Sequence, residues 1–260
     1  MTSWESQSTL FKDVHERNGR IDVVIANAGI VERKEFLDDE LTAYGELKQP
    51  DISVINVNLV GCMYTGKLAL WWFKKNPTPG GALVLISSVG GYADGISGGR
   101  YWLTIREGNH SIQSSQTWSM NIGCLCAHVG HRIFLRGIKH YMGEANGHVV
   151  AIAPWMTKTY SLTPPTRPNS RIMTSAFSDG WIKAGLPANE PEDISRAIAT
   201  AALRPDLNGC TLWVSGGRFT EIENRFCTYE GRGHWLGKEN NEDWEKGAEF
   251  LKAGYTLPDQ

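Results

Sequence analysis

Four side chains able to bind a metal or act as nucleophiles fall within eight residues: Cys124, Cys126, His128 and His131. Two thiols and two imidazoles are donors that tetrahedral zinc accepts in proteins. The Cys-x-Cys spacing is shorter than in the usual structural zinc sites, however, and no knuckle or finger pattern surrounds it. We therefore predict no metal site and interpret the four residues as ordinary parts of the fold.

A glycine-rich turn that could hold a phosphate is the second kind of site to look for, because backbone amides at a helix N-terminus bind anions. Glycines gather at Gly90-Gly91 and again at Gly95-Ile-Ser-Gly98-Gly99. Neither group has the G-x-G-x-x-G spacing of a dinucleotide-binding turn. The sequence therefore predicts no phosphate cradle.

The composition favours one globular domain without nucleic-acid or membrane partners. The chain has 260 residues, 41% of them hydrophobic, and a formal net charge of −2. So weak a charge argues against nucleic acid and acidic lipid, and the longest apolar stretches fall short of the ~20 residues that span a bilayer. The N-terminus lacks the basic start and apolar core of a signal peptide. Since five cysteines, an odd number, suit a reducing compartment, we expect a cytoplasmic protein.

Four apolar runs alternate with helical patterns and indicate the fold class. Each run looks like a parallel strand that is covered on both faces, and such alternation implies an α/β protein with a parallel sheet. Residues 102–147 break this rhythm, because neither a helical nor a strand period persists there, although 133–142 suit a short helix. The predicted strands are 21–29, 81–88, 148–154 and 210–217, and the predicted helices are 2–19, with Thr2 and Glu5 as a capping box, 51–75 and 191–203.

Six short motifs lie at the ends of these elements. They are Asn27-Ala28-Gly29, Asn56-Val57-Asn58-Leu59-Val60-Gly61, Ile86-Ser87-Ser88-Val89-Gly90-Gly91, Pro154-Trp155-Met156-Thr157-Lys158-Thr159, Pro191-Glu192-Asp193-Ile194 and Ser215-Gly216-Gly217. These motifs resemble those of the short-chain dehydrogenase/reductase family, and of its fungal members in particular, and they follow the family's order over about residues 2–221, apart from the irregular segment.

The resemblance implies a set of site residues. Ser88 would orient the carbonyl group of the substrate, Tyr101, 13 positions later, would transfer the proton, and Asn58 would hold a relay water. The residues that would contact a bound NAD or NADP are Asn27, Ala28, Gly29, Pro154, Thr157 and Thr159. Five of these residues have a structural alternative as well: Ser88 as a strand cap, Asn58 as a mid-helix polar residue, Asn27 as a tie between strands, and Thr157 and Thr159 as a loop cap.

Two departures from the family pattern put the cofactor and the proton transfer in doubt. The family has Lys four positions after its Tyr, where this chain has Ile105, with Arg106 beside it as an unlikely substitute. A tyrosine without a neighbouring cation keeps a pKa of about 10, so only ~0.1% is phenolate at neutral pH. The family's first three strands and their glycine-rich turn also have no counterpart. We therefore expect a truncated doubly wound, Rossmann-like sheet and doubtful dinucleotide binding.

These observations predict a single domain over 1–260, with a family-like core in 1–101 and 148–217, an irregular insertion at about 102–147, and a C-terminal extension in 218–260. The predicted function is an NAD(P)-dependent oxidoreductase for an alcohol or ketone of a small metabolite, impaired in this chain. The alternatives are a redox-inactive relative with a binding role, or an isomerase or cyclase that uses the old pocket. We expect a homodimer formed through helix 51–75 or through strand 22–28, which the absent strands would leave as an exposed edge.

Overall fold

The computed structural model describes residues 1–30, 39–92, 122–158 and 182–252, and the chain divides into two compact units, 1–220 and 221–260. Tyr101, Ile105 and Thr159 lie outside the described residues. The prediction of one domain stays a prediction, and the two units are described separately.

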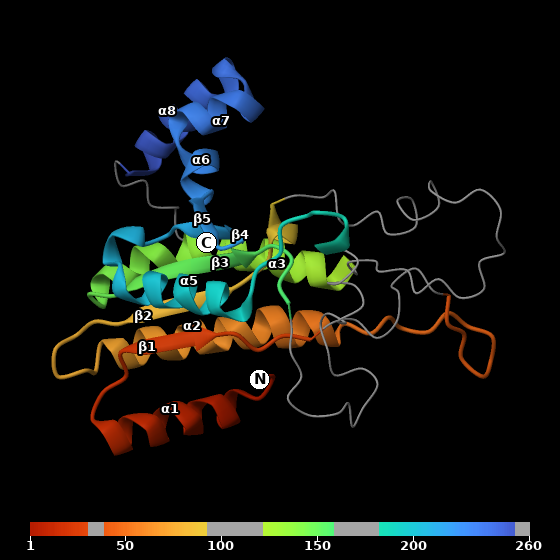
Figure 1. Cartoon of the computed structure of the whole chain (residues 1–260), viewed down its shortest axis with the longest axis horizontal. Helices are drawn as coiled ribbons and strands as arrows, with labels where there is room; N and C mark the ends of the chain where they lie inside the picture. Colours follow the sequence, from red (N-terminus) through yellow and green to blue (C-terminus); the bar gives the residue numbers. More distant parts are fainter. Residues whose placement is uncertain (31–38, 93–121, 159–181, 253–260) are drawn as a thin grey trace, which may run out of the picture. The chain divides into compact units, whose positions relative to one another are not determined.

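A five-stranded sheet forms the centre of the first unit (Figure 1). The first four strands pair in parallel, with Val24 opposite Leu83 and Ala151 opposite Thr211. Gly216 and Gly217, both with positive φ, form the two-residue turn before the fifth strand. The α/β class and the largely parallel sheet are thus confirmed. The sheet order is β1 (Val23–Ala26), β2 (Ala82–Ile86), β3 (His148–Pro154), β4 (Thr211–Ser215) and β5 (Arg218–Glu221).

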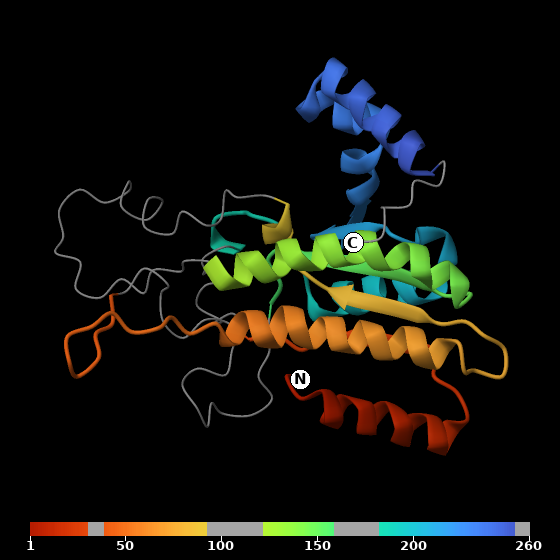
Figure 2. The same cartoon turned by 180° about the vertical axis from the view of Figure 1, so that it is seen from behind.

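Helices cover the two faces of the sheet unequally. On one face α1 (Trp4–Asn18), α2 (Gly61–Phe73) and α3 (Ile122–Glu144) share a core with Leu83, Leu85 and Val149. On the other face α5 (Pro191–Leu203) packs over β2 to β4 (Figures 1 and 2). No described helix is both long and apolar enough to cross a membrane.

The helix termini follow from local chemistry. Ser3, rather than the predicted Thr2, caps α1, because its hydroxyl accepts a hydrogen bond from the Ser6 amide at 3.1 Å. The helix ends at Gly19, whose φ of 73° suits a residue without a Cβ. Helix α5 begins at Pro191 with a capping box in which the carboxylate of Asp193 accepts from the Glu190 amide at 2.9 Å.

The predicted helix over 51–75 is present as two consecutive segments. A π-helix, η1 (Ile55–Val60), leads directly into α2. Each turn of a π-helix is wider than a turn of an α-helix and contains more residues. Such segments occur frequently at functional sites. Asn58, a predicted site residue, lies within it and is buried.

Residues 122–144 form one helix, α3, which confirms the short helix expected at 133–142 and shows that the prediction of an irregular segment is wrong for the remaining residues of α3. Buried side chains recur along this helix at Ala127, His131, Leu135, Ile138 and Met142. This helical period is hard to recognise in the sequence, because one core position is a histidine and the helix contains several glycines. Residues 102–121 of the predicted insertion lie outside the described part of the chain.

Strand β1 is also less buried than its sequence predicts. Val24 and Ala26 point into the core shared with α1 to α3, whereas Val23 and Ile25 are each 45% exposed. The helix on the second face, α5, packs over β2 to β4 and leaves these two side chains uncovered. The prediction that the strand lies at an edge agrees with its place at the end of the sheet order.

The second unit, as far as it is described (to residue 252), contains the helices α6 (Glu223–Cys227), α7 (Tyr229–Leu236) and α8 (Lys238–Lys252). Arg232 of α7 is its central polar residue: it donates to the side chain of Asn241 at 3.1 Å and pairs with Glu245 of α8. The described part of the C-terminal extension is therefore mainly helical.

Candidate functional site

Apart from Asn58 on η1, the predicted site residues within the described chain lie at or after the carboxyl ends of three neighbouring strands. Asn27, Ala28 and Gly29 follow β1, Ser87 and Ser88 follow β2, and Pro154 and Thr157 lie at and after the end of β3. Because β1, β2 and β3 are parallel neighbours, these ends share one edge of the sheet. Doubly wound sheets bind their ligands at that edge.

Ser88 caps a short turn beside a second, unpaired serine hydroxyl. Its own hydroxyl accepts from the Gly90 amide at 3.3 Å, at the start of the 3-10 turn η2 (Val89–Gly91). The neighbouring Ser87 has a buried hydroxyl without a hydrogen-bond partner among the described residues. A buried polar group in that state is uncommon and marks a place where a ligand or water can bind.

Asn58 connects η1 to the segment after β1. Its amide oxygen accepts from the backbone N–H of Ile30 at 2.8 Å, and its amide nitrogen donates to the Ile30 carbonyl at 2.9 Å. A Cβ on Gly29 would lie 3.5 Å from the same amide, so this backbone passes close to the side chain. Asn58 therefore positions the Asn-Ala-Gly segment, and its role with a relay water stays a prediction.

The N-terminal half of α3 brings to this site residues that sequence reasoning left out of it. The ring Nε2 of His131 lies 2.6 Å from the backbone oxygen of Asn58, and the ring Nε2 of His128 lies 3.3 Å from the thiol of Cys124. A Cβ on Gly91 would lie 3.0 Å from the backbone oxygen of His128, which shows how closely η2 and α3 approach.

Both imidazoles are shifted toward the neutral form. Burial, together with the neighbouring His131, lowers the pKa of His128 to about 4. Burial also lowers the pKa of His131, while its hydrogen bond to the Asn58 backbone acts in the opposite direction. The spacing of 124, 128 and 131 places the three residues on one face of the helix. This shared face can be recognised from the sequence only once the segment is known to be helical.

The loop after β3 is held by the start of α5. The hydroxyl of Thr157 donates to the Trp155 carbonyl at 3.0 Å, and its backbone bridges to Asn189, whose amide in turn donates to the Val214 carbonyl at 2.9 Å. Lys158 forms an ion pair with Glu190 at the N-cap of α5. Thr157 thus stabilises this loop, as expected if it acts as a loop cap. Its contact with a cofactor stays a prediction.

The described residues fit one end of a dinucleotide better than the other. Ser87, Ser88, Pro154 and Thr157 lie at and after the carboxyl ends of β2 and β3, and the unpaired Ser87 hydroxyl there can bind a polar group of a ligand. None of the described helices opens with a glycine-rich turn that could hold a pyrophosphate. Among the described residues no three His, Cys, Asp or Glu side chains come close enough to bind a metal ion.

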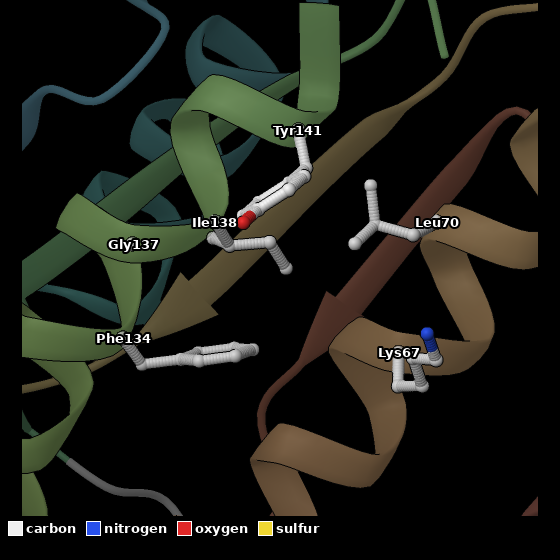
Figure 3. A pocket seen from close by; sticks show the side chains of 6 residues that line it. All are labelled: Lys67, Leu70, Phe134, Gly137, Ile138 and Tyr141. Atoms are coloured by element: carbon white, nitrogen blue, oxygen red, sulfur yellow. The ribbon is translucent and has the colours of Figure 1, made fainter. Parts of the chain in front are cut away.

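Two grooves are lined mostly by apolar described residues; the first lies away from this edge, and the second reaches it at Asn27 and Ala28. The first, of about 240 Å³, runs between α2 and α3 and is lined by Lys67, Leu70, Phe134, Gly137, Ile138 and Tyr141 (Figure 3). The second, of about 290 Å³, follows β1 along α1 and has residues 23–28 on one wall. Because most of their lining residues are apolar, the two grooves suit contact with protein better than polar chemistry.

Comparison with known proteins gives a consistent family. A family model described as short chain dehydrogenase matches residues 1–102. The short-chain dehydrogenase/reductase ATR7 of Stachybotrys chlorohalonatus is 30% identical over 250 residues, covering 92% of this chain and 68% of that protein. A gluconate 5-dehydrogenase from Burkholderia cenocepacia, solved with NADP and tartrate, superposes with a TM-score of 0.57 at 18% identity, over 83% of this chain and 71% of that one.

A further relative, the short-chain dehydrogenase/reductase ascJ of Acremonium egyptiacum, is 28% identical over 227 residues, or 86% of this chain. The aligned residues span 64% of the length of that relative. The catalytic properties of the longer relatives therefore come to this chain only as proposals.

Proposed function

This chain belongs to the short-chain dehydrogenase/reductase family, and on that premise we propose that it is an oxidoreductase interconverting an alcohol and a ketone of a small metabolite. The observation that carries the proposal is the convergence of Ser87-Ser88, Asn58 and Pro154–Thr157 at one edge of a parallel sheet. Ligands of such sheets bind at this edge.

In the proposed reaction the residues of the chain orient the substrate and move a proton. The Ser88 hydroxyl donates a hydrogen bond to the substrate oxygen, while the Gly90 amide that it accepts from fixes its orientation. Tyr101, outside the described residues, transfers the proton to or from that oxygen. Asn58 holds the Asn27–Gly29 segment in place through Ile30. A bound nicotinamide would supply or accept the hydride.

We propose NADP as the dinucleotide, since the gluconate 5-dehydrogenase with a similar fold was solved with it. The test is titration of the protein with NADPH and with NADH, following energy transfer from its 10 tryptophans. Saturation in the micromolar range, tighter for NADPH, is expected. Absence of binding at millimolar concentration would contradict the proposal and favour a redox-inactive binding protein or an isomerase, because the described residues supply no phosphate cradle.

The role of Ser88 is tested by the substitution Ser88→Ala. Loss of one donor to the reacting oxygen typically lowers kcat about 10²–10³-fold, and we expect a decrease of that size in ketone-dependent NADPH oxidation. Ser195→Ala is the matched control, because this exposed hydroxyl only donates to the Pro191 carbonyl on α5. Equal activities of the two variants would remove Ser88 from the proposed site.

We also propose that the protein forms a homodimer through the exposed edge of β1. Val23 and Ile25 are exposed there, beside a groove lined by apolar residues of α1. An apolar strand edge with unpaired backbone groups readily adds another strand. The groove between α2 and α3 in Figure 3 is the alternative surface.

A further inference from the structure

The groove between α2 and α3 is lined mainly by hydrocarbon and lies outside the proposed active site. Its volume is about 240 Å³, and Figure 3 shows Phe134 and Ile138 of α3 reaching toward Leu70 of α2. The two helices approach closely beside it, since a Cβ on Gly66 would lie 2.6 Å from the Phe134 ring. At Gly137 the groove is open, because a Cβ there would meet nothing within 4 Å.

Exposed apolar side chains extend the groove along both helices. Trp71 of α2 is 56% exposed, and Ile133 and Tyr141 of α3 are each 57% exposed. Trp71 lies one turn after Lys67, and Ile133 lies one turn before Gly137, so each shares a helix face with a residue that lines the groove. Exposed apolar side chains gathered beside a groove mark a site of contact with another molecule.

The charges around the groove are mainly positive. Lys67 lines it and has no ion-pair partner among the described residues. Lys75 lies over the Trp71 ring, 4.6 Å from its centroid. Helix α2 carries no acidic residue, and the one acid of α3, Glu144, pairs with Lys74 at 3.3 Å. An occupant with acidic side chains therefore complements this surface.

We propose that this groove binds an amphipathic helix of another protein, with leucine or phenylalanine on its apolar face and aspartate or glutamate on its flanks. The apolar face fills the space beside Phe134 and Gly137, and the acidic side chains lie near Lys67 and Lys75. Helices that bind in a groove are recognised through side chains one turn apart on a single face. Because the groove lies away from the carboxyl edge of the sheet, this interaction goes beyond the proposed hydride transfer.

Two rival occupants suit the groove less well. A second copy of the chain that docked through this face would bring Lys67 and Lys75 toward the same cations, and like charges across an interface repel. An anionic membrane would match the charges, but its surface is flat and would leave the open space at Gly137 unfilled. A helix is about 10–12 Å across with its side chains, and one row of those side chains can enter the groove.

The first test is the binding of two fluorescein-labelled model peptides to the wild-type protein, followed by fluorescence anisotropy. Both are helices of about 18 residues, or roughly five turns, with leucine at every third or fourth position. One carries glutamate on its flanks and the other lysine. We expect the glutamate peptide to bind at least about tenfold more tightly, and this advantage to disappear at about 1 M salt, which screens exposed charges beyond about 3 Å. Equal affinities at low salt would overturn the proposal.

A bulky side chain at Gly137 locates the binding. Gly137→Leu fills open space without a clash, so the variant should fold normally while its affinity for the glutamate peptide falls at least about tenfold. Gly143→Leu is the matched control, because Gly143 is on the same helix, has equally open space around its Cβ and does not line the groove. The same affinity in both variants would show that the peptide binds elsewhere and would overturn the proposal.

Lys67→Glu tests the charge preference, and two further measurements test the rival occupants. The substitution should weaken the glutamate peptide at least about fivefold and strengthen the lysine peptide. Conversion of a dimer to a monomer by Gly137→Leu in light scattering would assign the groove to a second copy. Phosphatidylserine vesicles that bind the wild-type protein but not Gly137→Leu would assign it to a membrane, and either result would overturn the proposal. Dinucleotide titration tests the oxidoreductase separately, so either proposal can fail alone.

Discussion

At the scale of single residues, Asn58 determines how the candidate site is assembled. Its side chain holds Ile30 through two hydrogen bonds, and its backbone oxygen receives the ring N–H of His131. One residue of the π-helix therefore joins the segment after β1 to helix α3. Sequence motifs predicted its location in the site, whereas His131 could not be found that way because its partner is a backbone atom 73 positions away.

Replacement of Asn58 tests this connecting role. In Asn58→Ala both Ile30 groups lose their partners in a partly buried place, which typically costs about 1–3 kcal/mol. We expect the free energy of unfolding in urea to fall by that amount. Asn56→Ala, two residues earlier in η1 at an exposed position, should change it by less than about 0.5 kcal/mol. Equal effects would refute the connecting role.

Asp193 makes stability depend on pH at the start of α5. Its carboxylate accepts from the Glu190 amide and pairs with Arg196, and these bonds lower its pKa below the ordinary 3.8. A lowered pKa stabilises the fold above the unfolded value and loses this effect as pH falls through the folded value. Asp193→Asn should therefore lower Tm at pH 5, with a difference that shrinks between pH 4 and pH 2.

Glu192→Gln is the control for that measurement, because Glu192 is an exposed acid in the same first turn of α5. Its effect on Tm should be small and nearly constant from pH 5 to pH 2. If the Asp193→Asn difference also stayed constant over this range, the carboxylate charge would have no part in the capping box.

At the scale of elements, α3 shows where interpretation of the sequence failed and why. Helix prediction rests on apolar residues recurring at 3.6-residue intervals. In α3 the core positions include His131, and Gly130 and Gly137 lower the helix propensity of its centre. Buried parallel strands such as β2 and β3 were predictable because they consist of uninterrupted apolar residues. Only the part of α3 at 133–142 was predicted, because the polar core residue His131 in its first half finds its hydrogen-bond partner through a tertiary contact.

The two glycines of α3 should respond oppositely to alanine. A Cβ at Gly130 would lie 2.6 Å from a methyl carbon of Leu59 in η1, whereas a Cβ at Gly137 meets nothing within 4 Å. Gly137→Ala should stabilise the protein by about 0.5–1 kcal/mol through helix propensity alone. Gly130→Ala should destabilise it by about 1–3 kcal/mol through overpacking. Urea unfolding measures both, and equal stabilisation would mean that α3 and η1 do not approach closely.

At the scale of the whole molecule, the proposed dimer depends on the edge strand β1. The sequence indicated that β1 would be an edge, and β1 does end the sheet order. The sequence did not predict that one face of β1 would be exposed, because Val23 to Ala26 are all apolar. The exposed face results from the position of α5, which covers β2 to β4 and leaves the β1 side chains on that face uncovered. An uncovered apolar edge of this kind promotes self-association.

Two lysine substitutions separate the two candidate dimer surfaces. Ile25, 45% exposed on β1, and Trp71, 56% exposed on α2, are both accessible, so neither replacement should unfold the chain. A lysine in place of Ile25 puts a charge on the strand edge, and natural proteins use such charges to prevent an edge strand from pairing with a strand of another molecule. We expect light scattering to give a dimer for the wild-type protein and Trp71→Lys, and a monomer for Ile25→Lys. A monomer only with Trp71→Lys would assign the interface to the helices instead.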